Sequence, residues 1–256
     1  MSEEQLDRSS VLGKAIAVLQ AFDPNDRQVT LAELAERTAL PKTTVHRLAG
    51  QLVAARLLNR TPNGYALGSG LFELGMRASP ERGLIEVATP FMQDLYVRTG
   101  ETVHLGILED FEVVYVSKIG GHRQADAPSR LGGRMPLYCT AIGKALLANS
   151  PDSVIAEQLA RPLRRRTPHT IVAPGLLRAQ LNQIAEDGVS FEFEESTLGL
   201  VCVAAPILDA DDAPLAAISV TGPVHRFHPR AHATAVRAAA AGASSTLARR
   251  AHLIDG

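Results

Sequence analysis

A short segment near the N-terminus constrains the fold of this chain more than any other part of the sequence. It begins at residues 30–33 (TLAE), a capping box in which the Thr30 hydroxyl accepts a hydrogen bond from the Glu33 amide while the Glu33 side chain reaches back. Pro41 then separates this helix from the next, because proline disfavours helix at the preceding residue and suits a helix's first turn. The segment therefore predicts two short helices joined by a tight turn, at about 31–37 and 42–55.

These two helices fit the pattern of a helix-turn-helix. The small residue Ala35 allows the helices to cross closely, while Val45 and Leu48 anchor the second helix against the first. A second helix held in this way enters the major groove of DNA with its N-terminal residues at the base edges. Its outer face, and so the expected DNA contact, comprises Lys42, Thr43, Thr44, His46 and Arg47.

A predicted hairpin follows directly, where a wing would lie. Extended stretches at 57–60 and 65–67 flank Asn63-Gly64, a dipeptide that favours a tight hairpin because both residues tolerate positive φ. Arg60 is then placed to contact a flanking phosphate or the minor groove. Two helices packed merely into a core, with solvated charges, are the alternative; the capping box, turn, basic face and hairpin together favour a winged helix-turn-helix.

The overall charge at first argues against a DNA-binding protein, which is usually basic. The chain has 26 Lys and Arg residues against 27 Asp and Glu residues, a net charge of -1. The distribution is uneven, however. Residues 27–66 hold six basic and two acidic side chains, a net +4, whereas residues 81–256 hold 17 basic and 19 acidic ones, a net -2. A small basic DNA reader joined to a mildly acidic second domain is therefore expected.

Length and composition place the chain among globular proteins of the cytoplasm. Its 256 residues, 46% hydrophobic and 21% charged, suit one large domain or two ordinary ones. No apolar run reaches the roughly 18 residues of a membrane span, and the first residues are polar, so no signal peptide is expected. With only Cys139 and Cys202, a reducing compartment is expected rather than a disulfide framework.

The rest of the chain alternates helices with hairpin-linked strands. This order predicts an α+β domain of the sensor type with an antiparallel sheet, rather than a doubly wound parallel sheet. Residues 120–136 are expected to form a loop, and residues 78–80 a boundary. Helices are expected at about 11–22, 71–77, 84–98, 140–149, 151–160, 175–187 and 228–252, and strands at 102–108, 113–119, 189–194, 200–208 and 214–221.

One stretch of this second part suits a bound anion. Residues 139–143 (CTAIG) open a helix, and free amides at a helix N-terminus favour negative charge through the helix dipole. On the predicted strands, Leu200 and Cys202 face one side together, as do Ser219 and Thr221. Small polar groups on one sheet face suit a pocket that orients a ligand by a few hydrogen bonds.

The chain resembles the IclR family of bacterial transcriptional regulators over nearly its whole length. The resemblance implies a winged helix-turn-helix at 1–68, a linker helix at 69–80, and an effector-binding and oligomerisation domain akin to GAF and PAS sensors at 81–256. One departure is Ala39, where the family usually has glycine in the turn; alanine at positive φ costs of order 1 kcal/mol. The matching segments are LAELAERTALPKTTVHRLAGQLVAARLL (31–58), RMPLYCTAIGKALLA (134–148) and LGLVCVAAPILDADDAPLAAISVTGP (198–223).

The resemblance also implies partners and a ligand site. Such regulators act as dimers or tetramers on operator DNA and respond to small metabolites, commonly organic or aromatic acids. Two modules on one duplex would also offset the modest charge of one reader. In the linker helix, Leu71, Phe72 and Leu74 are expected to dimerise the chain and transmit the signal. The effector pocket is implied at Ala141 and Ile142, through their backbone amides, and at Glu192, Leu200, Cys202, Ser219 and Thr221.

Each pocket residue has a plainer alternative. Ser219 and Thr221 could satisfy neighbouring backbone, Cys202 could be a small core residue, and Glu192 could be a solvated strand residue. For the whole chain, the competing function is a metabolite-binding sensor that acts through protein contacts without specific DNA binding. A salt-dependent, sequence-specific gel shift separates the two.

Other chemistry is weighed and not favoured. The three histidines at 225, 228 and 232 include an HxxH pair, but no Cys or acidic residue completes a metal set. The basic residues Arg161 and 164–166 are expected in a solvated loop or in helix-end contacts. Neither Cys139 nor Cys202 has a base placed beside it by sequence, although His104 and His122 are candidates, so no catalysis, metal or cofactor is expected.

Overall fold

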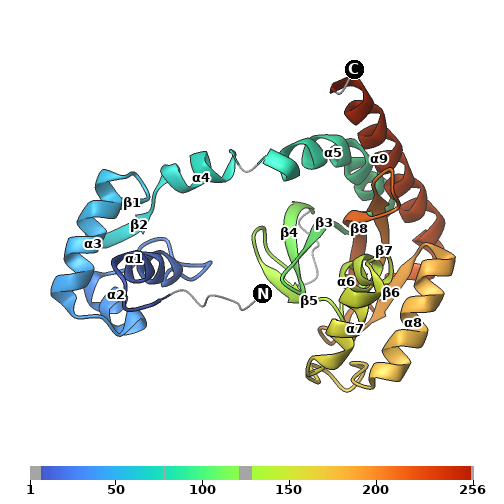
Figure 1. The fold of residues 1–256 in the computed structure, drawn as a ribbon, viewed down its shortest axis with the longest axis horizontal. Coiled ribbons are helices and arrows are strands. Elements are labelled where there is room, and N and C mark those ends of the chain that lie inside the picture. Colours follow the sequence, from blue (N-terminus) through green and yellow to red (C-terminus); the bar gives the residue numbers. More distant parts are fainter. Residues whose placement is uncertain (1–6, 78, 121–128, 255–256) are drawn as a thin grey trace. The chain divides into compact units, whose positions relative to one another are not determined.

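The computed structural model describes residues 7–77, 79–120 and 129–254 (Figure 1). The chain divides into two compact units, Met1–Ser79 and Pro80–Gly256. The first unit contains a helix-turn-helix followed by a hairpin, and the second is built on an antiparallel sheet with helices. The predicted α+β class is therefore confirmed.

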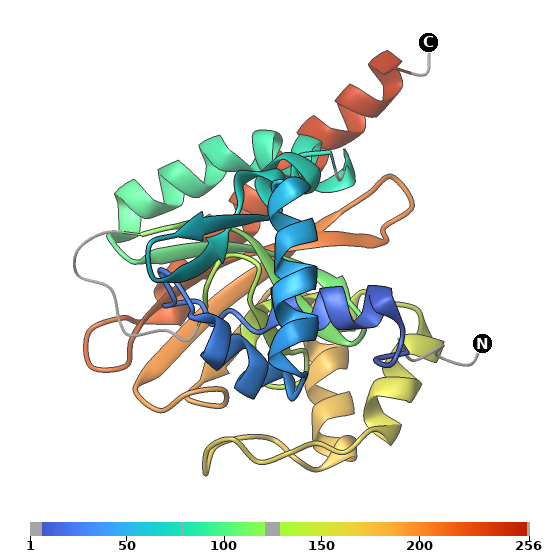
Figure 2. The same ribbon diagram turned by 90° about the vertical axis from the view of Figure 1, so that its left-hand side faces the viewer.

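The first unit forms around the predicted helix pair. Thr30 caps α2: its Oγ1 accepts from the Glu33 amide at 3.2 Å, and Glu33 Oε2 accepts from the Thr30 amide at 2.8 Å. Apolar residues of the helices and hairpin then close one small core around Leu34, Val45 and Leu48. The elements of this unit are α1 (Val11–Gln20), α2 (Leu31–Thr38), α3 (Lys42–Ala54), β1 (Leu58–Thr61) and β2 (Gly64–Leu67). Helices α1, α2 and α3 are the blue ribbons of Figure 2.

The turn between α2 and α3 is left-handed at Ala39, with φ 55° and ψ 25°. Its amide donates to the Glu36 carbonyl at 3.2 Å, which closes the helix in the usual left-handed manner. The turn therefore keeps its geometry with alanine where the resembling family has glycine, at the strain of a Cβ in this region.

The hairpin pairs Leu58 with Leu67 and Arg60 with Tyr65. Val29 adds one further bridge, since its amide donates to the Tyr65 carbonyl at 2.8 Å and its carbonyl accepts from the Tyr65 amide at 2.9 Å. This bridge attaches the wing to the segment that precedes α2, so the wing is fixed relative to the helices.

The predicted linker differs in its boundaries. Helix α4 covers Ser69–Gly75, which is shorter than a helix over 69–80, and α5 (Ser79–Thr99) begins five residues before the expected 84. The segment 78–80 was expected as a boundary, and the two compact units divide within it, between Ser79 and Pro80. Helix α5 nevertheless begins there, because proline is tolerated in the first turn of a helix, where its missing N–H has no partner to lose.

The second unit is centred on a sheet with strand order β5-β4-β3-β8-β7-β6, in which every neighbouring pair is antiparallel. One strand, β5, lies within the stretch expected as loop at 120–136. Three residues are too short to show a period of two, so its pairing with β4 has no signal in the sequence. The strands are β3 (Thr102–Glu109), β4 (Glu112–Ile119), β5 (Arg134–Pro136), β6 (Ser190–Phe193), β7 (Leu200–Leu208) and β8 (Pro214–Pro223).

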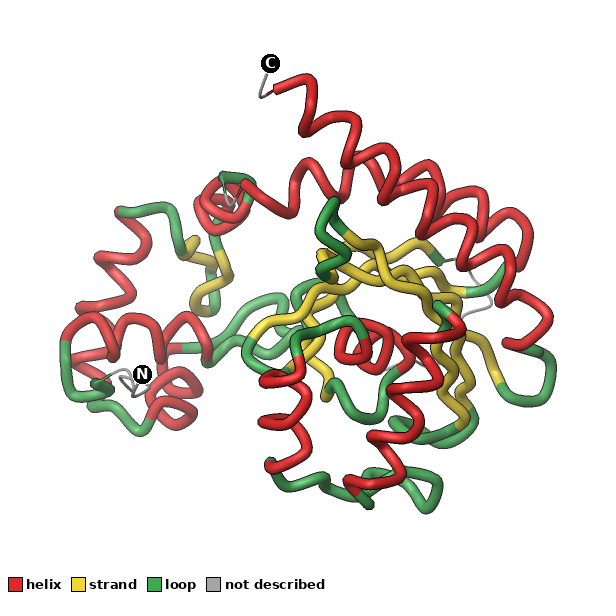
Figure 3. The backbone as a smooth tube through the Cα atoms, turned by 45° about the vertical axis from the view of Figure 1, so that its right-hand side comes forward, coloured by secondary structure: helices red, strands yellow, loops and turns green. Residues whose placement is uncertain are grey.

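Helices cover both faces of this sheet (Figure 3). Helices α5 and α9 (Ala233–Ile254) pack on one face, while α6 (Ala141–Ala148) and α8 (Pro174–Asp187) pack on the other, next to α7 (Asp152–Ala160). Alternation along β7 separates the two cores, with Val201 and Val203 facing α5 and α9, and Cys202 facing α6. The α6 face carries the polar strand residues that the sequence singled out.

The last helix begins later than expected. Residues Pro229–His232 form a 3-10 turn, and α9 starts only at Ala233, so the prediction of one helix from residue 228 is wrong at its first turn. The ring of His232 stacks on Phe227 with centroids 5.1 Å apart, which holds this turn against the unit.

Candidate ligand pocket and DNA-reading helix

The outer face of α3 is polar and accessible. Lys42, Thr43, His46 and Arg47 are exposed and Thr44 is half-buried, while Val45 and Leu48 are buried beneath them. Pro41 precedes the helix and provides no side-chain cap. The Thr44 amide donates to the Pro41 carbonyl at 2.9 Å, whereas the amides of Lys42 and Thr43 have no acceptor among the described residues, which suits a phosphate group.

Ion pairing changes the charge count made from the sequence. Arg37 pairs with Asp26 and lies 3.6 Å from Asp23, two acids just outside the counted window of 27–66. Arg56 pairs with Glu73, whereas Lys42, Arg47, Arg60 and Arg27 form no ion pair with another described residue. Three of these four cations lie on α3 and the wing.

On the wing, Arg60 is exposed but oriented. Its guanidinium lies over the Tyr65 ring, 5.6 Å from the centroid, and donates to the Tyr65 hydroxyl at 3.3 Å. This contact holds the Arg60 side chain along the hairpin. Less side-chain entropy is then lost when Arg60 binds DNA.

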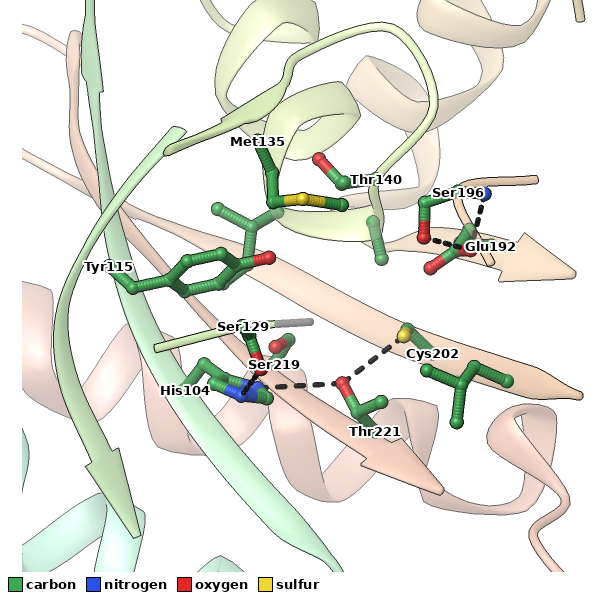
Figure 4. A pocket seen from close by; sticks show the side chains of 13 residues that line it. His104, Tyr115, Ser129, Met135, Thr140, Glu192, Ser196, Cys202, Ser219 and Thr221 are labelled. Carbon is green, nitrogen blue, oxygen red and sulfur yellow. Dashed lines mark hydrogen bonds between the residues drawn. The ribbon is translucent and has the colours of Figure 1, made fainter. Parts of the chain in front are cut away.

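In the second unit, the seven residues expected to hold an effector all line one cavity (Figure 4). The cavity lies between the N-terminus of α6 and the adjacent sheet face, and its volume is about 30 Å³, which accommodates about two water-sized groups. The binding role of these residues stays a prediction. Six further residues line the cavity and were missing from the expected set: His104, Tyr115, Ser129, Met135, Thr140 and Ser196.

The helix N-terminus at this cavity is open. Thr140 caps α6, since its Oγ1 accepts from the Gly143 amide at 3.1 Å while its hydroxyl donates to the Pro136 carbonyl at 2.9 Å. The amides of Ala141 and Ile142 have no acceptor among the described residues, although both residues are buried. Two unpaired donors at the positive end of a helix are suited to an anionic group.

Cross-strand pairing assembles the sheet side of the cavity. Cys202 lies opposite Thr221, with Sγ and Oγ1 3.1 Å apart, and His104 lies opposite Ser219. His104 Nε2 lies 2.7 Å from Ser129 Oγ and Nδ1 lies 3.5 Å from Thr221 Oγ1. Burial lowers the pKa of His104 to about 3, so its imidazole is neutral. His104 was missing from the expected set because only the register of β3 against β8 brings it to this site, and that register is not visible in the local sequence.

Glu192 is buried, with 1% of its surface exposed, so the alternative of a solvated strand residue is wrong. Its Oε1 accepts from the Ser196 amide at 2.9 Å and from the Ser196 hydroxyl at 2.8 Å. Burial raises the pKa of Glu192, against the effect of these hydrogen bonds. Burial therefore favours the neutral form of the Glu192 carboxyl, the form that does not repel an anion bound nearby.

Behind α6 lies an ion pair that the sequence did not predict. Lys144 is completely buried, and its Nζ lies 2.5 Å from Glu195 Oε1 and 3.1 Å from Gln180 Oε1. These contacts join α6, α8 and the segment after β6, which also carries Ser196 of the cavity.

The cysteines and arginines that the sequence offered for catalysis or nucleic-acid binding have other surroundings in the structure. Burial raises the pKa of Cys139 to about 12 and also raises the pKa of Cys202, so both thiols are protonated and poorly nucleophilic. His122 lies outside the described residues. Arg161 stacks over the Phe111 ring at 3.8 Å, at the end of α7. Within the described part of the chain, no group of three or more metal-ligating side chains is found.

Both parts of the chain match models of known protein families. A model of the IclR helix-turn-helix domain matches residues 11–62, and a model described as "Bacterial transcriptional regulator IclR C-terminal" matches residues 76–246. The chain belongs to the IclR family of bacterial transcriptional regulators. It is thus a DNA-binding regulator of the IclR type, with the family's C-terminal domain. In the described residues, no helix is long and apolar enough to cross a membrane.

Among curated IclR-family proteins, the chain is 35% identical over 228 residues to the regulator KdgR of Escherichia coli K12, covering 88% of this chain and 86% of that one. It is 30% identical over 221 residues to the repressor IclR of the same organism, covering 84% and 81%. Among solved structures, an IclR homologue from Microbacterium hydrocarbonoxydans complexed with 4-hydroxybenzoate has a TM-score of 0.86 at 29% identity, covering 93% and 99%. Thermotoga maritima IclR has a TM-score of 0.80 at 30% identity, covering 93% and 98%.

Proposed function

We propose that this regulator reads operator DNA with α3 and the β1–β2 wing, under the control of a small organic acid bound at the N-terminus of α6. The observation that carries the proposal is the pair of amides, at Ala141 and Ile142, that have no acceptor among the described residues at the helix end that lines the cavity. A carboxylate accepts from both and is stabilised by the helix dipole. That the similar Microbacterium hydrocarbonoxydans protein was crystallised with 4-hydroxybenzoate, an aromatic acid, supports the same ligand class.

In this proposal the other cavity residues orient the ligand. Cys202, Ser219 and Thr221 contribute small polar groups from β7 and β8, Leu200 an apolar contact, and Glu192 a carboxyl that burial favours in its neutral form. The cavity is small, so an aromatic acid requires a side chain to move aside. Met135 lines the cavity and is unbranched and flexible, which makes it the side chain best suited to move.

The division of labour follows the two units. We assign DNA reading to residues 1–68, linkage to residues 69–80, and effector binding and oligomerisation to residues 81–256. Phe72 and Leu74 of α4 are 72% and 52% exposed, and Leu71 is half-buried. Large exposed apolar side chains are the expected basis of a homodimer, and two such dimers would form a tetramer.

Effector binding then changes operator affinity through subunit geometry. A dimer reads two half-sites at a fixed spacing, so a ligand that favours one arrangement of the two α3 helices changes affinity, in a repressor or an activator alike. The protein would act in the cytoplasm, where operator DNA is found.

The experiment begins with an operator selected from random duplex DNA by the purified full-length protein. Arg47→Ala and Lys42→Ala are each expected to weaken binding about five- to 150-fold, from the loss of about 1–3 kcal/mol per base or phosphate contact. Arg98→Ala, on the surface of the second unit, is the charge-matched control and leaves binding unchanged. Selection that yields no preferred sequence, or binding that is insensitive to salt, would favour the sensor that acts through protein contacts.

For the ligand, a thermal-shift screen of small carboxylic acids is expected to identify compounds that raise the melting temperature and change operator affinity. Ser219→Ala, Thr221→Ala and Cys202→Leu combined should abolish the shift. An unchanged ligand affinity in that triple variant would place the pocket elsewhere.

A further inference from the structure

The polar groups of the cavity are almost all paired with one another. In the described part of the chain, two hydroxyls in its lining have no hydrogen-bond partner, those of Tyr115 and Ser219. Both residues are buried, 7% and 3% exposed, and both line the cavity, so their hydroxyls are available to a group bound there. The paired lining groups are those of His104, Ser129, Thr140, Glu192, Ser196, Cys202 and Thr221.

The side chain of Tyr115 is directed into the cavity (Figure 4). Its backbone is held by two hydrogen bonds to the segment before β5: the amide donates to the Gly133 carbonyl at 3.1 Å, and the carbonyl accepts from the Gly132 amide at 2.8 Å. Across β3 it lies opposite Gly106, and its ring contacts the His104 ring with centroids 5.1 Å apart. These contacts hold the backbone of Tyr115 and support its ring on the cavity side.

Hydroxyl groups inside proteins are nearly always paired, and these two can find a partner only in a group that occupies the cavity. We propose that Tyr115 and Ser219 recognise a hydroxyl group of the effector, which makes the ligand a hydroxylated carboxylic acid. The inference rests on the proposed function, in that the ligand's carboxylate occupies the α6 amides.

The chemistry matches on both sides. A phenol and a serine hydroxyl each donate one hydrogen bond and accept others, and a ligand hydroxyl does the same. A carboxylate, by contrast, only accepts, and its two donors are already present at Ala141 and Ile142. Burial raises the pKa of Tyr115, which keeps its hydroxyl in the donating form. Tyr115 was absent from the set of residues expected from the sequence, and it becomes a specificity residue of the site.

The test uses matched pairs of acids that differ by one hydroxyl: benzoate with 4-hydroxybenzoate, and propionate with lactate. Calorimetric titration of the full chain is expected to show tighter binding of the hydroxylated member of at least one pair, by about three- to tenfold, the usual effect of one neutral hydrogen bond. Tyr115→Phe should reduce this advantage to about onefold and leave the plain acid's affinity unchanged, and Ser219→Ala should reduce it in part.

Tyr138→Phe is the matched control, since the Tyr138 hydroxyl donates to the Arg164 carbonyl at 2.7 Å outside the cavity. It should lower the melting temperature of the free protein and leave the hydroxyl preference intact. Tyr115→Phe should leave that melting temperature unchanged or raise it, because it removes an unpaired buried group. A structural hydroxyl would give the opposite result and overturn the inference.

Different results would refute the acid-responsive function and the recognition of a hydroxyl group. If no acid of either pair binds, the acid-responsive function is wrong and the inference falls with it. If both members of each pair bind equally, or if Tyr115→Phe weakens both members to the same extent, the effector site stands and only the hydroxyl recognition is refuted.

Discussion

The buried pair of Lys144 and Glu195 supports a quantitative prediction about stability. Lys144 makes its contacts with no exposure to solvent, and Glu195 Oε2 has no partner among the described residues. Replacing Lys144 with methionine keeps a flexible chain of similar length and removes the cation. In this variant the Glu195 carboxyl stays buried near Gln180, but it no longer has a positive charge beside it.

The size of the effect follows from the protonation of Glu195. Its ordinary pKa is 4.5, and burial already raises the pKa against the lowering effect of Lys144. Without the cation the folded state takes up a proton, which at pH 7 costs about 1.36 kcal/mol for each of about 2.5 pH units, or about 3.4 kcal/mol. Breaking a buried pair by removing one partner costs about 3–5 kcal/mol, in agreement. We expect Lys144→Met to lose about 3 kcal/mol at pH 7.

The sign of the pH dependence is also determined. In Lys144→Met the folded pKa of Glu195 is raised further above its unfolded value, so the folded state holds a proton that the unfolded state has lost. Stability of the variant therefore falls as the pH rises above about 4.5, by about 1.4 kcal/mol per unit. Close to pH 4.5 the difference from the wild type should shrink to the lost packing and hydrogen bonds alone.

Urea unfolding measured by tyrosine fluorescence provides the assay. The chain has no tryptophan, and three of its four tyrosines, Tyr96, Tyr115 and Tyr138, belong to the second unit. The double variant Lys144→Met with Glu195→Leu removes both charges and is expected within about 1 kcal/mol of the wild type. Arg98→Met, which breaks an exposed pair with Asp94, is the control and should cost less than about 1 kcal/mol.

Two results would refute this reasoning. One is a cost below about 1 kcal/mol for Lys144→Met at pH 7, which would mean that water reaches Glu195. The other is a double variant as unstable as the single one, which would show that packing at position 144, not the unpaired carboxylate, sets the loss.

Three further outcomes are expected. Ala39→Gly should stabilise the first unit by up to about 1 kcal/mol, because glycine relieves the left-handed φ of 55°; a lower melting temperature by circular dichroism would contradict this. Glu192→Gln should gain stability over the wild type as pH rises above 4.5, by up to about 1.4 kcal/mol per unit, because burial raises the pKa of Glu192 in the folded state; equal pH profiles in urea unfolding would exclude it. Phe72→Asp should shift sedimentation toward the monomer, and an unchanged oligomer would remove α4 from the interface.

Much of the first unit could be predicted because its signals are local. A capping box joins residues three apart, Pro41 acts on its neighbours, and Asn-Gly acts within one turn, so α2, α3 and the hairpin were each expected within a few residues. The errors arose where local rules allow two outcomes. Proline both ends and begins helices, which accounts for the early start of α5, and a strand as short as β5 has no periodicity to detect.

For the candidate site, the sequence identified which side chains share a strand face but not what they meet. The alternation of Leu200 with Cys202 and of Ser219 with Thr221 is a property of extended backbone, and the structure has all four around one cavity. His104 and Tyr115 reach the same cavity from β3 and β4, and this depends on pairings between strands far apart in the chain.

The sequence by itself determined the family and the α+β class, since these follow from local patterns and from matching segments. The residues for DNA contact and for an anion site are predictions made from the same patterns. The tertiary structure alone decided which polar groups are satisfied. Lys144 meets Glu195 across 51 residues, Arg37 is paired by Asp26, and the hydroxyls of Tyr115 and Ser219 are left open. The reason is physical: satisfaction of a buried group depends on every neighbour that packing brings within hydrogen-bond distance, and packing joins residues that no sequence window contains together.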